Sequence, residues 1–351
     1  MSNVKMFSNI SFKEGIDDAD PNFQANNSNN EWLNYNFTAE EIKSEIQKLK
    51  LGKACGLDLI RNEMLRNAPS DLIDIIVRLF NVILNTGLVP ENWCLGAMMP
   101  LYKGKGSRSD PDNFRGITLL SCLSKLFTSI LNRRLTFFLD GTGSIGEEQA
   151  GFRRGYSTTD HIFALHAIIQ FYQSKGKQVY AAFVDYRKAF DFVDRASLWS
   201  KMLSLGINGN ILKVICNIYS KAKSCIKSSK GASDFFRCNI GVRQGENLSP
   251  LLFAIFLNDF EFFLSRDTNY NGLGNLAEEF CQRLSTEDTE VFFRLFCLLY
   301  ADDTIILAES AFELQCALNK LNEYCQLWHL NVNASKTKIV IFSAGVVQNY
   351  P

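Results

Sequence analysis

The chain has 351 residues, 46% of them hydrophobic, and a formal net charge of zero. This length and apolar content can bury a substantial core, which we expect to be divided between two subdomains. No apolar stretch reaches membrane-spanning length, and the N-terminus has no signal-peptide pattern. The 10 cysteines have no Cys-x-x-Cys or Cys/His ligand spacing, which argues against a zinc site and a disulfide framework. We therefore expect an intracellular protein, of the nucleus or the cytoplasm.

The charged residues are unevenly distributed along the chain. There are seven basic and two acidic residues from Lys103 to Arg134, and six basic and one acidic from Lys213 to Arg237. Such basic stretches suit a phosphate backbone or a nucleotide triphosphate. A solvated helix face has the same composition, so either stretch alone leaves both interpretations open.

The first part of the chain is predicted to be mainly helical. Residues 1–36 contain seven asparagines from Asn22 onward and few periodic apolar positions, which predicts a flexible leader. The capping box Thr38-Ala-Glu-Glu41 predicts the start of the first helix. Apolar residues at helical spacing predict further helices at 71–84, 123–139 and 159–173, with a short strand near 98–101.

Residues 179–345 alternate between strand and helix patterns. Predicted strands lie at 179–185, 235–242 and 338–342 and on both sides of 301–303, and predicted helices lie at 196–205, 211–222, 249–264 and 314–328. This order predicts an α+β unit in which helices cover one face of a sheet. The acidic segment 266–294 lacks such a pattern and is predicted to be an inserted loop, and 346–351 a short tail.

Two adjacent carboxylates, Asp302 and Asp303, follow Tyr300 and Ala301 at the predicted tip of a tight β-hairpin. Like charges this close repel each other, and a divalent cation would neutralise them. Asp is also a favoured turn residue, so a lone pair more often marks a solvated turn. A metal site therefore needs a further carboxylate from another strand.

Asp185 is that further carboxylate, because it follows the continuous apolar strand pattern Val179–Val184. Three carboxylates on neighbouring strand ends can hold two Mg²⁺ ions about 3.5–4 Å apart. Mg²⁺ prefers hard oxygen ligands and keeps places for water and substrate phosphates. The pattern predicts in-line phosphoryl or nucleotidyl transfer.

Several segments resemble, in order and spacing, the core motifs of reverse transcriptases, and most closely those of non-LTR (LINE-type) retrotransposons. The core segments are Phe183–Asp191, Gly241–Phe253 and Leu299–Asp303, and the lead-in segments are Pro100–Lys103, Asn113–Leu120 and Gln149–Asp160. The resemblance covers roughly residues 37–343. One departure is Glu246-Asn247, where many relatives have Asp-Pro; we expect it to change the stiffness of the loop more than its chemistry.

The resemblance implies a right-hand polymerase architecture of the α+β class. Residues 37–178 would form the fingers and lead-in region, and residues 179–345 the palm, with a ferredoxin-like sheet. A thumb would be missing or truncated, because the chain stops at Pro351. Endonuclease and thumb regions would then lie in adjacent sequence.

The resemblance also implies the metal centre. Asp185, Asp302 and Asp303 would be the catalytic carboxylates and, with the backbone carbonyl of Tyr186, the ligands of two Mg²⁺ ions, for which Mn²⁺ could substitute. In the family the second residue of the hairpin pair contributes less than the first, so Asp303 would be the weakest ligand. Asp191 belongs to the same motif without being a ligand, and we expect it to have a structural role.

Four further residues are implied to act on the nucleotide. Lys103 and Arg115 would hold the triphosphate, for which Arg offers bidentate geometry. Phe190 would collide with a ribose 2′-hydroxyl and so select dNTPs. Gln244 would lie against the incoming nucleotide, in a loop whose glycines allow close approach of the backbone.

The departing pyrophosphate needs a proton donor. In Asn333-Ala-Ser-Lys336-Thr337-Lys338, Lys336 is the best match to the lysine proposed for this role in the family, and we treat it as catalytic. Lys338 is the alternative.

The implied function is RNA-directed DNA polymerisation, in which a primer 3′-hydroxyl is extended with dNTPs. The implied partners are an RNA template, a DNA primer and dNTPs, with no membrane. A catalytically silent, retrotransposon-derived remnant that binds nucleic acid is the alternative that one sequence leaves open. An RNA-dependent RNA polymerase shares the carboxylate logic but is disfavoured by Phe190.

Overall fold

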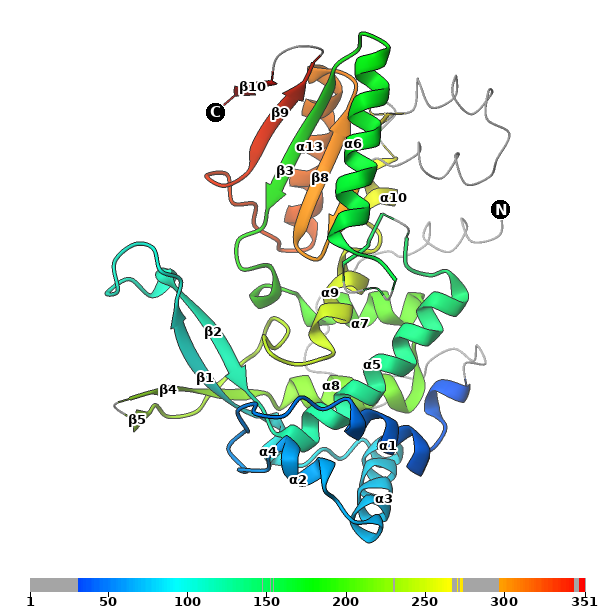
Figure 1. Cartoon of the computed structure of the whole chain (residues 1–351), viewed down its shortest axis with the longest axis vertical. Coiled ribbons are helices and arrows are strands. Elements are labelled where there is room, and N and C mark those ends of the chain that lie inside the picture. The colour runs from blue at the N-terminus through cyan, green and yellow to red at the C-terminus, as the bar shows by residue number, and fades with distance from the viewer. Residues whose placement is uncertain are drawn as a thin grey trace.

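The described strands form two sheets, each of five strands (Figure 1). The computed structural model describes residues 31–146, 148–151, 153, 155–229, 231–266, 270, 272–273 and 297–343, and the backbone of 347–350. We name the sheets after the predicted subdomains, the palm sheet and the fingers sheet. Among the described residues, no helix combines the length and the apolar surface that crossing a membrane requires.

The palm sheet has the strand order β10-β9-β3-β8-β7, and every neighbouring pair is antiparallel. Its strands are β3 (Val179–Asp185), β7 (Cys297–Tyr300), β8 (Asp303–Ala308), β9 (Lys338–Phe342) and β10 (Val347–Tyr350). The predicted strands around the hairpin and at 338–342 are therefore confirmed. Residues 347–350, which we expected to be part of a tail, instead form the edge strand beside β9.

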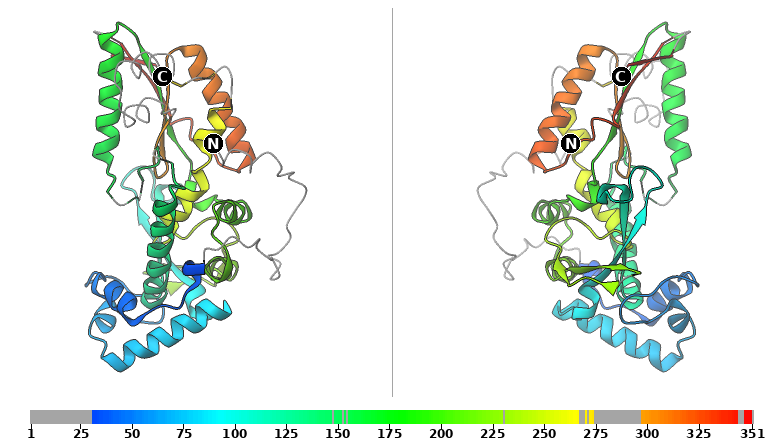
Figure 2. Two further views of the ribbon diagram at one scale, coloured as in Figure 1. Left: turned by 90° about the vertical axis from the view of Figure 1, so that its right-hand side faces the viewer. Right: turned by 90° about the vertical axis from the view of Figure 1, so that its left-hand side faces the viewer.

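Helices cover both faces of the palm sheet (Figure 2). Helix α13 (Ala311–Leu327) packs on β3 and β8 from one side, and α6 (Thr158–Ser174) packs from the other. The α+β class is confirmed, whereas the expectation of helices on one face only is wrong. The reason is that β3 is apolar on both faces: Val179 and Ala181 pack in the cluster of α6, and Ala182 and Val184 in the main core.

The fingers sheet combines both halves of the chain. Its strands are β1 (Leu95–Tyr102), β2 (Phe114–Leu119), β4 (Lys223–Ser228), β5 (Gly231–Ala232) and β6 (Phe236–Arg237). β1 and β2 form an antiparallel hairpin that projects from the helices, and β4 pairs with β1 in parallel (Figure 1). The two sheets therefore do not divide the chain at residue 178. Helix α6, which precedes this position, packs on the palm sheet, and β4, which follows it, belongs to the fingers sheet.

The predicted strand at 235–242 is reduced to the two residues of β6. Beyond it, the N–H of Cys238 donates to the carbonyl of Ala222, and the N–H groups of Gly241 and Val242 donate to the carbonyls of Val193 and Phe190. These backbone groups bind loops instead of a neighbouring strand, so the segment is irregular.

The helices follow the apolar periodicity closely. The remaining helices are α1 (Ala39–Gln47), α2 (Asn62–Arg66), α3 (Ser70–Thr86), α4 (Glu91–Cys94), α5 (Cys122–Thr142), α7 (Arg195–Ser204), α8 (Gly209–Ser220), α9 (Ser249–Leu257) and α10 (Phe260–Leu264), with short 3₁₀ turns at Glu31–Asn34, Pro111–Asn113 and Ala189–Asp191. The Thr38 hydroxyl accepts from the N–H of Glu41, as the capping box predicts. The prediction of a single helix at 249–264 is wrong, because the structure has two helices there, α9 and α10, with a break at residues 258–259. There the Asn258 side chain binds backbone groups of Ser144 and Gly146, and Asp259 binds Lys201.

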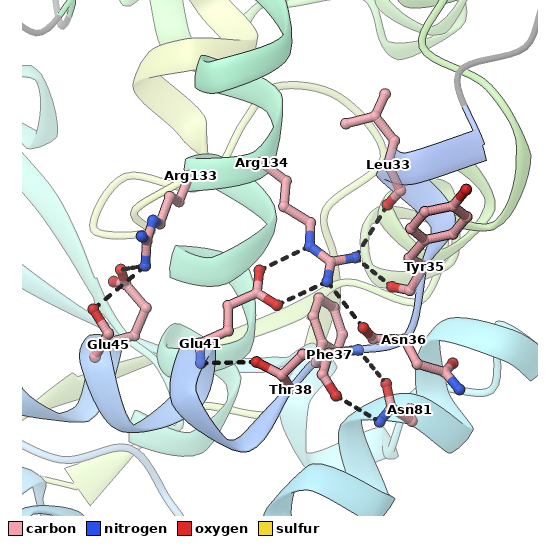
Figure 3. Close-up of polar contacts among 11 residues, drawn as sticks. Leu33, Tyr35, Asn36, Phe37, Thr38, Glu41, Glu45, Asn81, Arg133 and Arg134 are labelled. Carbon is pink, nitrogen blue, oxygen red and sulfur yellow. Dashed lines mark hydrogen bonds and ion pairs between the residues drawn. The ribbon is translucent and has the colours of Figure 1, made fainter.

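Arg134, on α5, anchors the N-terminal segment (Figure 3). Its guanidinium forms two 2.8 Å hydrogen bonds with the Glu41 carboxylate, donates to the carbonyls of Leu33, Tyr35 and Asn36, and lies over the Phe37 ring. Leu33 is fully buried. Residues 31–36, which we expected to belong to the leader, are therefore packed against α5.

Two predictions lie outside the described residues. They are the leader over residues 1–30 and most of the loop at 266–294. Within that loop Tyr270 and Leu273 are described, and both are buried. The Tyr270 hydroxyl donates to the carbonyl of Leu307 on β8, so this part of the predicted loop packs on the palm sheet.

Candidate active site

Two strand ends of the palm sheet bring the predicted carboxylates together. Asp185, the last residue of β3, is paired across the sheet with Asp303, the first residue of β8. Tyr300 pairs with Asp303 in the β7–β8 hairpin, so Ala301 and Asp302 form its two-residue turn. Ala301 has a φ of 61°, in the left-handed region where a residue with a Cβ is strained by about 1–2 kcal/mol.

The loop before β9 binds Asp185 through Asn333 and Lys336. The carbonyl of Asp185 accepts from the N–H of Asn333 at 2.7 Å, and its carboxylate accepts from the Asn333 side chain at 2.9 Å. Lys336 Nζ lies 3.5 Å from the same carboxylate oxygen and is 68% exposed. Lys338 instead lies within the sheet, paired with Phe183. Of the two lysines considered from sequence, Lys336 is thus the one whose ammonium lies beside a predicted metal ligand.

The electrostatics of this edge favour a bound cation. Partial burial raises the pKa of Asp303, the neighbouring carboxylates of Asp302 and Asp185 raise it further, and Lys336 opposes them. Within the described part of the chain, no three carboxylate, histidine or cysteine side chains are gathered as a ready-made metal site. The donor set nevertheless fits a hard divalent cation, because it consists of carboxylate oxygens whose mutual repulsion such an ion would relieve.

Tyr186 can contribute only its backbone to such a site. Its side chain is buried, and burial raises the pKa of its hydroxyl far above the ordinary range. The phenol therefore stays protonated inside the core. That the carbonyl of Tyr186 binds a metal ion stays a prediction.

A cavity of about 290 Å³ joins the carboxylate edge to the fingers sheet. It is lined by Arg115, Phe190, Arg243, Gln244, Gly245, Glu246, Ser249, Pro250 and Asp302. Four residues predicted from sequence, Arg115, Phe190, Gln244 and Asp302, thus line one space. The half-buried Phe190 ring stacks on Phe253 of α9 with 4.7 Å between ring centroids, which fixes its orientation.

The loop that carries Gln244 rests on the motif that follows β3. Gln244 Nε2 donates to the Asp191 carboxylate at 2.9 Å. Gly241 has a φ of 78°, and a Cβ there would lie 2.6 Å from the carbonyl oxygen of Asp191. Asp191 therefore holds Gln244, in line with the structural role we expected of it.

Lys103 does not line the cavity. Its Nζ donates to the carbonyl of Asp112, within the loop that joins β1 and β2. The Asp112 carboxylate in turn pairs with Lys188, beyond Asp185, at 2.8 Å. The tip of the fingers hairpin is thus linked to the loop that follows the carboxylate strand.

Sequence reasoning missed a buried polar network under the Gln244 loop. Glu246 is 4% exposed and accepts from the hydroxyl of the fully buried Tyr219 at 2.8 Å. Arg243 donates to the carbonyls of Trp93, Cys94 and Ile218. In the sequence, the departure from the family motif at Glu246-Asn247 marked this position as unusual. The sequence did not show that the Glu246 side chain is buried.

Comparison with known proteins agrees with this geometry. The chain is 28% identical to the RNA-directed DNA polymerase from mobile element jockey of Drosophila funebris, over 88% of this chain and 32% of that protein. It is 26% identical to a probable RNA-directed DNA polymerase from transposon X-element of Drosophila melanogaster, with the same coverage of both chains. The chain thus spans about a third of the length of these relatives.

The chain is also similar to solved structures and to one protein family. An apo telomerase from Candida tropicalis, truncated from its C-terminal domain, superposes with a TM-score of 0.49 and 14% identity, over 85% of this chain and 63% of that one. The profile of the family described as reverse transcriptase (RNA-dependent DNA polymerase) matches residues 103–348. Because this match covers more than half of the chain and includes the carboxylate strands, the chain belongs to the reverse transcriptase family.

Proposed function

We propose that this chain is the polymerase core of a non-LTR retrotransposon enzyme and extends a primer 3′-hydroxyl with dNTPs on an RNA template. The observation that carries the proposal is the cavity in which Asp302 lies with Arg115, Phe190 and Gln244. Each of these side chains has chemistry suited to one part of a nucleoside triphosphate. The family membership and the relatives named as RNA-directed DNA polymerases support the same reaction.

Reverse transcriptases generally use divalent metal ions. In this chain Asp185, Asp302 and Asp303, with the carbonyl of Tyr186, would hold two Mg²⁺ ions. Bound there, the ions would activate the primer hydroxyl and stabilise the leaving pyrophosphate. Burial raises the pKa of Asp303, and repulsion from Asp302 and Asp185 raises it further. The repulsion supports this assignment, because it is relieved when the carboxylates share a cation.

The remaining residues bind and orient the substrates. Arg115 would pair with the triphosphate through two parallel hydrogen bonds, and Lys103, at the hairpin tip, would reach it from the fingers side. The Phe190 ring, held by Phe253, would exclude a 2′-hydroxyl. Gln244, fixed by Asp191, would contact the nucleotide from the wall of the cavity that it lines. Lys336 would donate a proton to pyrophosphate, since its ammonium lies at the carboxylate edge.

Primer extension on an RNA template with Mg²⁺ and dNTPs tests this proposal. We expect extension by the wild-type chain, or by a longer chain with downstream sequence. Asp302→Ala should lower the rate by at least about 1,000-fold, because each 1.36 kcal/mol of lost transition-state stabilisation is tenfold. An absence of synthesis by every Asp302-containing form would refute the polymerase proposal and favour a silent remnant that binds nucleic acid.

A further inference from the structure

The segment that precedes α6 lies against the edge strand of the palm sheet. Gln149 pairs with Leu299 of β7 in a short parallel bridge. The N–H of Ala150 donates to the carbonyl of Leu299 at 3.0 Å, and the N–H of Leu299 donates to the carbonyl of Glu148 at 2.8 Å. Residues 148–151 thus extend the sheet beyond β7, beside the hairpin that carries Asp302. We call them the buttress segment.

The buttress segment touches the turn itself at Gly151. A Cβ on this residue would lie 2.1 Å from the backbone nitrogen of Ala301 and 2.9 Å from the carbonyl carbon of Tyr300. No side chain can fit between two backbones that approach so closely, so glycine is required here for contact and not for its own conformation. The buttress segment therefore packs directly on the strained residue of the turn.

The carboxamide of Gln149 lies between the buttress segment and the turn, where it binds both backbones. Its side chain is fully buried, and Oε1 accepts from the N–H of Gly151 at 2.9 Å and from the N–H of Ala301 at 3.4 Å. The two backbone donors determine which way the carboxamide faces. Its Nε2 has no hydrogen-bond partner among the described residues. A buried carboxamide with an unused donor is unfavourable as a mere core filler, since an apolar side chain of equal size would avoid that penalty.

The backbone of the buttress segment is itself held. Arg153 Nη1 donates to the carbonyls of Gly146 and Gln149, at 2.9 and 3.4 Å. The N–H of Gly146 in turn donates to the side chain of Asn258, at the break between α9 and α10. Gln149 therefore projects from a fixed position toward the hairpin.

We propose that Gln149 is a positioning residue for the catalytic hairpin: its carboxamide oxygen holds the Ala301 amide in the left-handed conformation and thereby sets the direction of the Asp302 side chain. The proposal rests on the proposed function only in calling the hairpin catalytic. The hold of Gln149 on Ala301 can be measured without DNA synthesis. Ala301 needs such an external hold because a residue with a Cβ disfavours positive φ.

Hydrogen exchange on the full chain tests the contact directly. Gln149→Met keeps the length of the side chain and removes the acceptor, whereas Gln149→Glu keeps an acceptor oxygen. In a peptide from Leu299 to Thr304, Gln149→Met should exchange roughly tenfold faster than wild type, and Gln149→Glu at close to the wild-type rate. A peptide from Val179 to Asp185 is the internal control and should be unchanged. Exchange at the wild-type rate in Gln149→Met would overturn the proposal.

Primer extension then separates positioning from core packing. Gln149→Met should lower kcat by about 100-fold with little change in KM for dNTPs, because a displaced Asp302 impairs the reaction more than binding. Ala301→Gly removes the strain, so the double variant Ala301→Gly/Gln149→Met should be within about threefold of Ala301→Gly alone. Independent, multiplicative effects of the two changes would contradict the proposed role.

The role of Gln149 can be decided even if the chain makes no DNA or the Gln149→Met variant does not fold. If no form of the chain makes DNA, the polymerase proposal fails, and the exchange rates still decide the role of Gln149. If Gln149→Met does not fold, the double variant decides: recovery of folded protein supports the proposal, and failure to recover it refutes the proposal.

Discussion

Two lysine–aspartate pairs of similar length show how differently the palm and the fingers hold their charges. Lys201 Nζ lies 2.6 Å from Asp259, and Lys188 Nζ lies 2.8 Å from Asp112. The Lys201 side chain is 10% exposed, and that of Lys188 is 48% exposed. The first pair lies under the palm, between α7 and the break after α9, and the second joins the palm to the tip of the fingers hairpin.

The difference lies in the surroundings rather than in the distance. Lys201 also donates to the carbonyl of Phe256 and the hydroxyl of Tyr324, and its ammonium lies 3.9 Å from the centre of the Trp328 ring. Breaking a buried pair of this kind destabilises a protein by about 3–5 kcal/mol, whereas an exposed pair contributes about 0–1 kcal/mol. The Lys201 contacts thus tie α7 to Phe256 of α9 and Tyr324 of α13 in a buried cluster, whereas the ion pair at the tip of the fingers hairpin is solvated.

Loss of a carboxylate at the palm edge is the largest effect we expect. Asp185→Asn keeps the size of the side chain but removes a charge at the proposed metal site, so primer extension should fall by at least about 1,000-fold. The urea midpoint should change little, because the side chain is 34% exposed and an amide can still bond with Asn333. Residual activity within tenfold of wild type would show that the palm edge is not the reactive region.

Phe190→Ala should change sugar selectivity by the next largest factor. Removal of the ring opens the cavity where a 2′-hydroxyl would lie, so the ratio of ribonucleotide to deoxyribonucleotide incorporation should rise by about 10- to 100-fold. Single-nucleotide extension with matched rNTP and dNTP measures it. Phe253→Leu is the control, since it alters the stacking partner but leaves the ring of Phe190 in place. An unchanged ratio in Phe190→Ala would refute the steric role.

Lys201 gives a pH-dependent test of the buried pair. Burial lowers the pKa of Lys201 from 10.5 to about 8, against the opposing effect of Asp259. Between these values only the unfolded lysine is protonated, so the contribution of Lys201 to the free energy of unfolding rises with pH. The difference in this free energy between wild type and Lys201→Met should therefore grow in favour of wild type by about 1–2 kcal/mol from pH 7 to pH 9.5.

Urea unfolding at the two pH values measures this change. Titrating cysteines and tyrosines are present in both proteins, so their effects cancel in the difference. Lys188→Met is the matched control, because it replaces an exposed lysine of an ion pair instead of a buried one. Equal behaviour of the two lysine variants would remove the distinction between buried and exposed pairs.

The smallest effect is expected at the exposed pair. Asp112→Asn removes the partner of Lys188 but keeps the carbonyl that binds Lys103. The free energy of unfolding should change much less than in Lys201→Met, and the change should vanish at high salt. Urea unfolding at low and high ionic strength checks this. A salt-independent loss as large as that in Lys201→Met would place this contact in the same class as the buried pair.

The elements themselves could largely be predicted, because they depend on neighbouring residues. The Thr38 capping box starts α1, and the apolar run of β3 ends at Asp185. Where a predicted element differs from the structure, a contact with a residue far away in the sequence determines the local conformation. The helix at 249–264 breaks because Asn258 binds the loop after α5 and Asp259 binds α7. The spacing of apolar residues along the sequence does not reveal such contacts.

The sequence by itself determined the order of the carboxylates, the strand ends that carry them and the family of the chain, because strand patterns and motif spacing are local properties. Only the tertiary structure decided that α6 covers the second palm face, that β4 pairs with β1, and that Gln149 and Glu246 are buried beneath the site. These features depend on contacts between segments far apart in the chain. Such contacts form because folding buries apolar faces against each other and pairs backbone N–H and C=O groups of segments that are distant in the sequence.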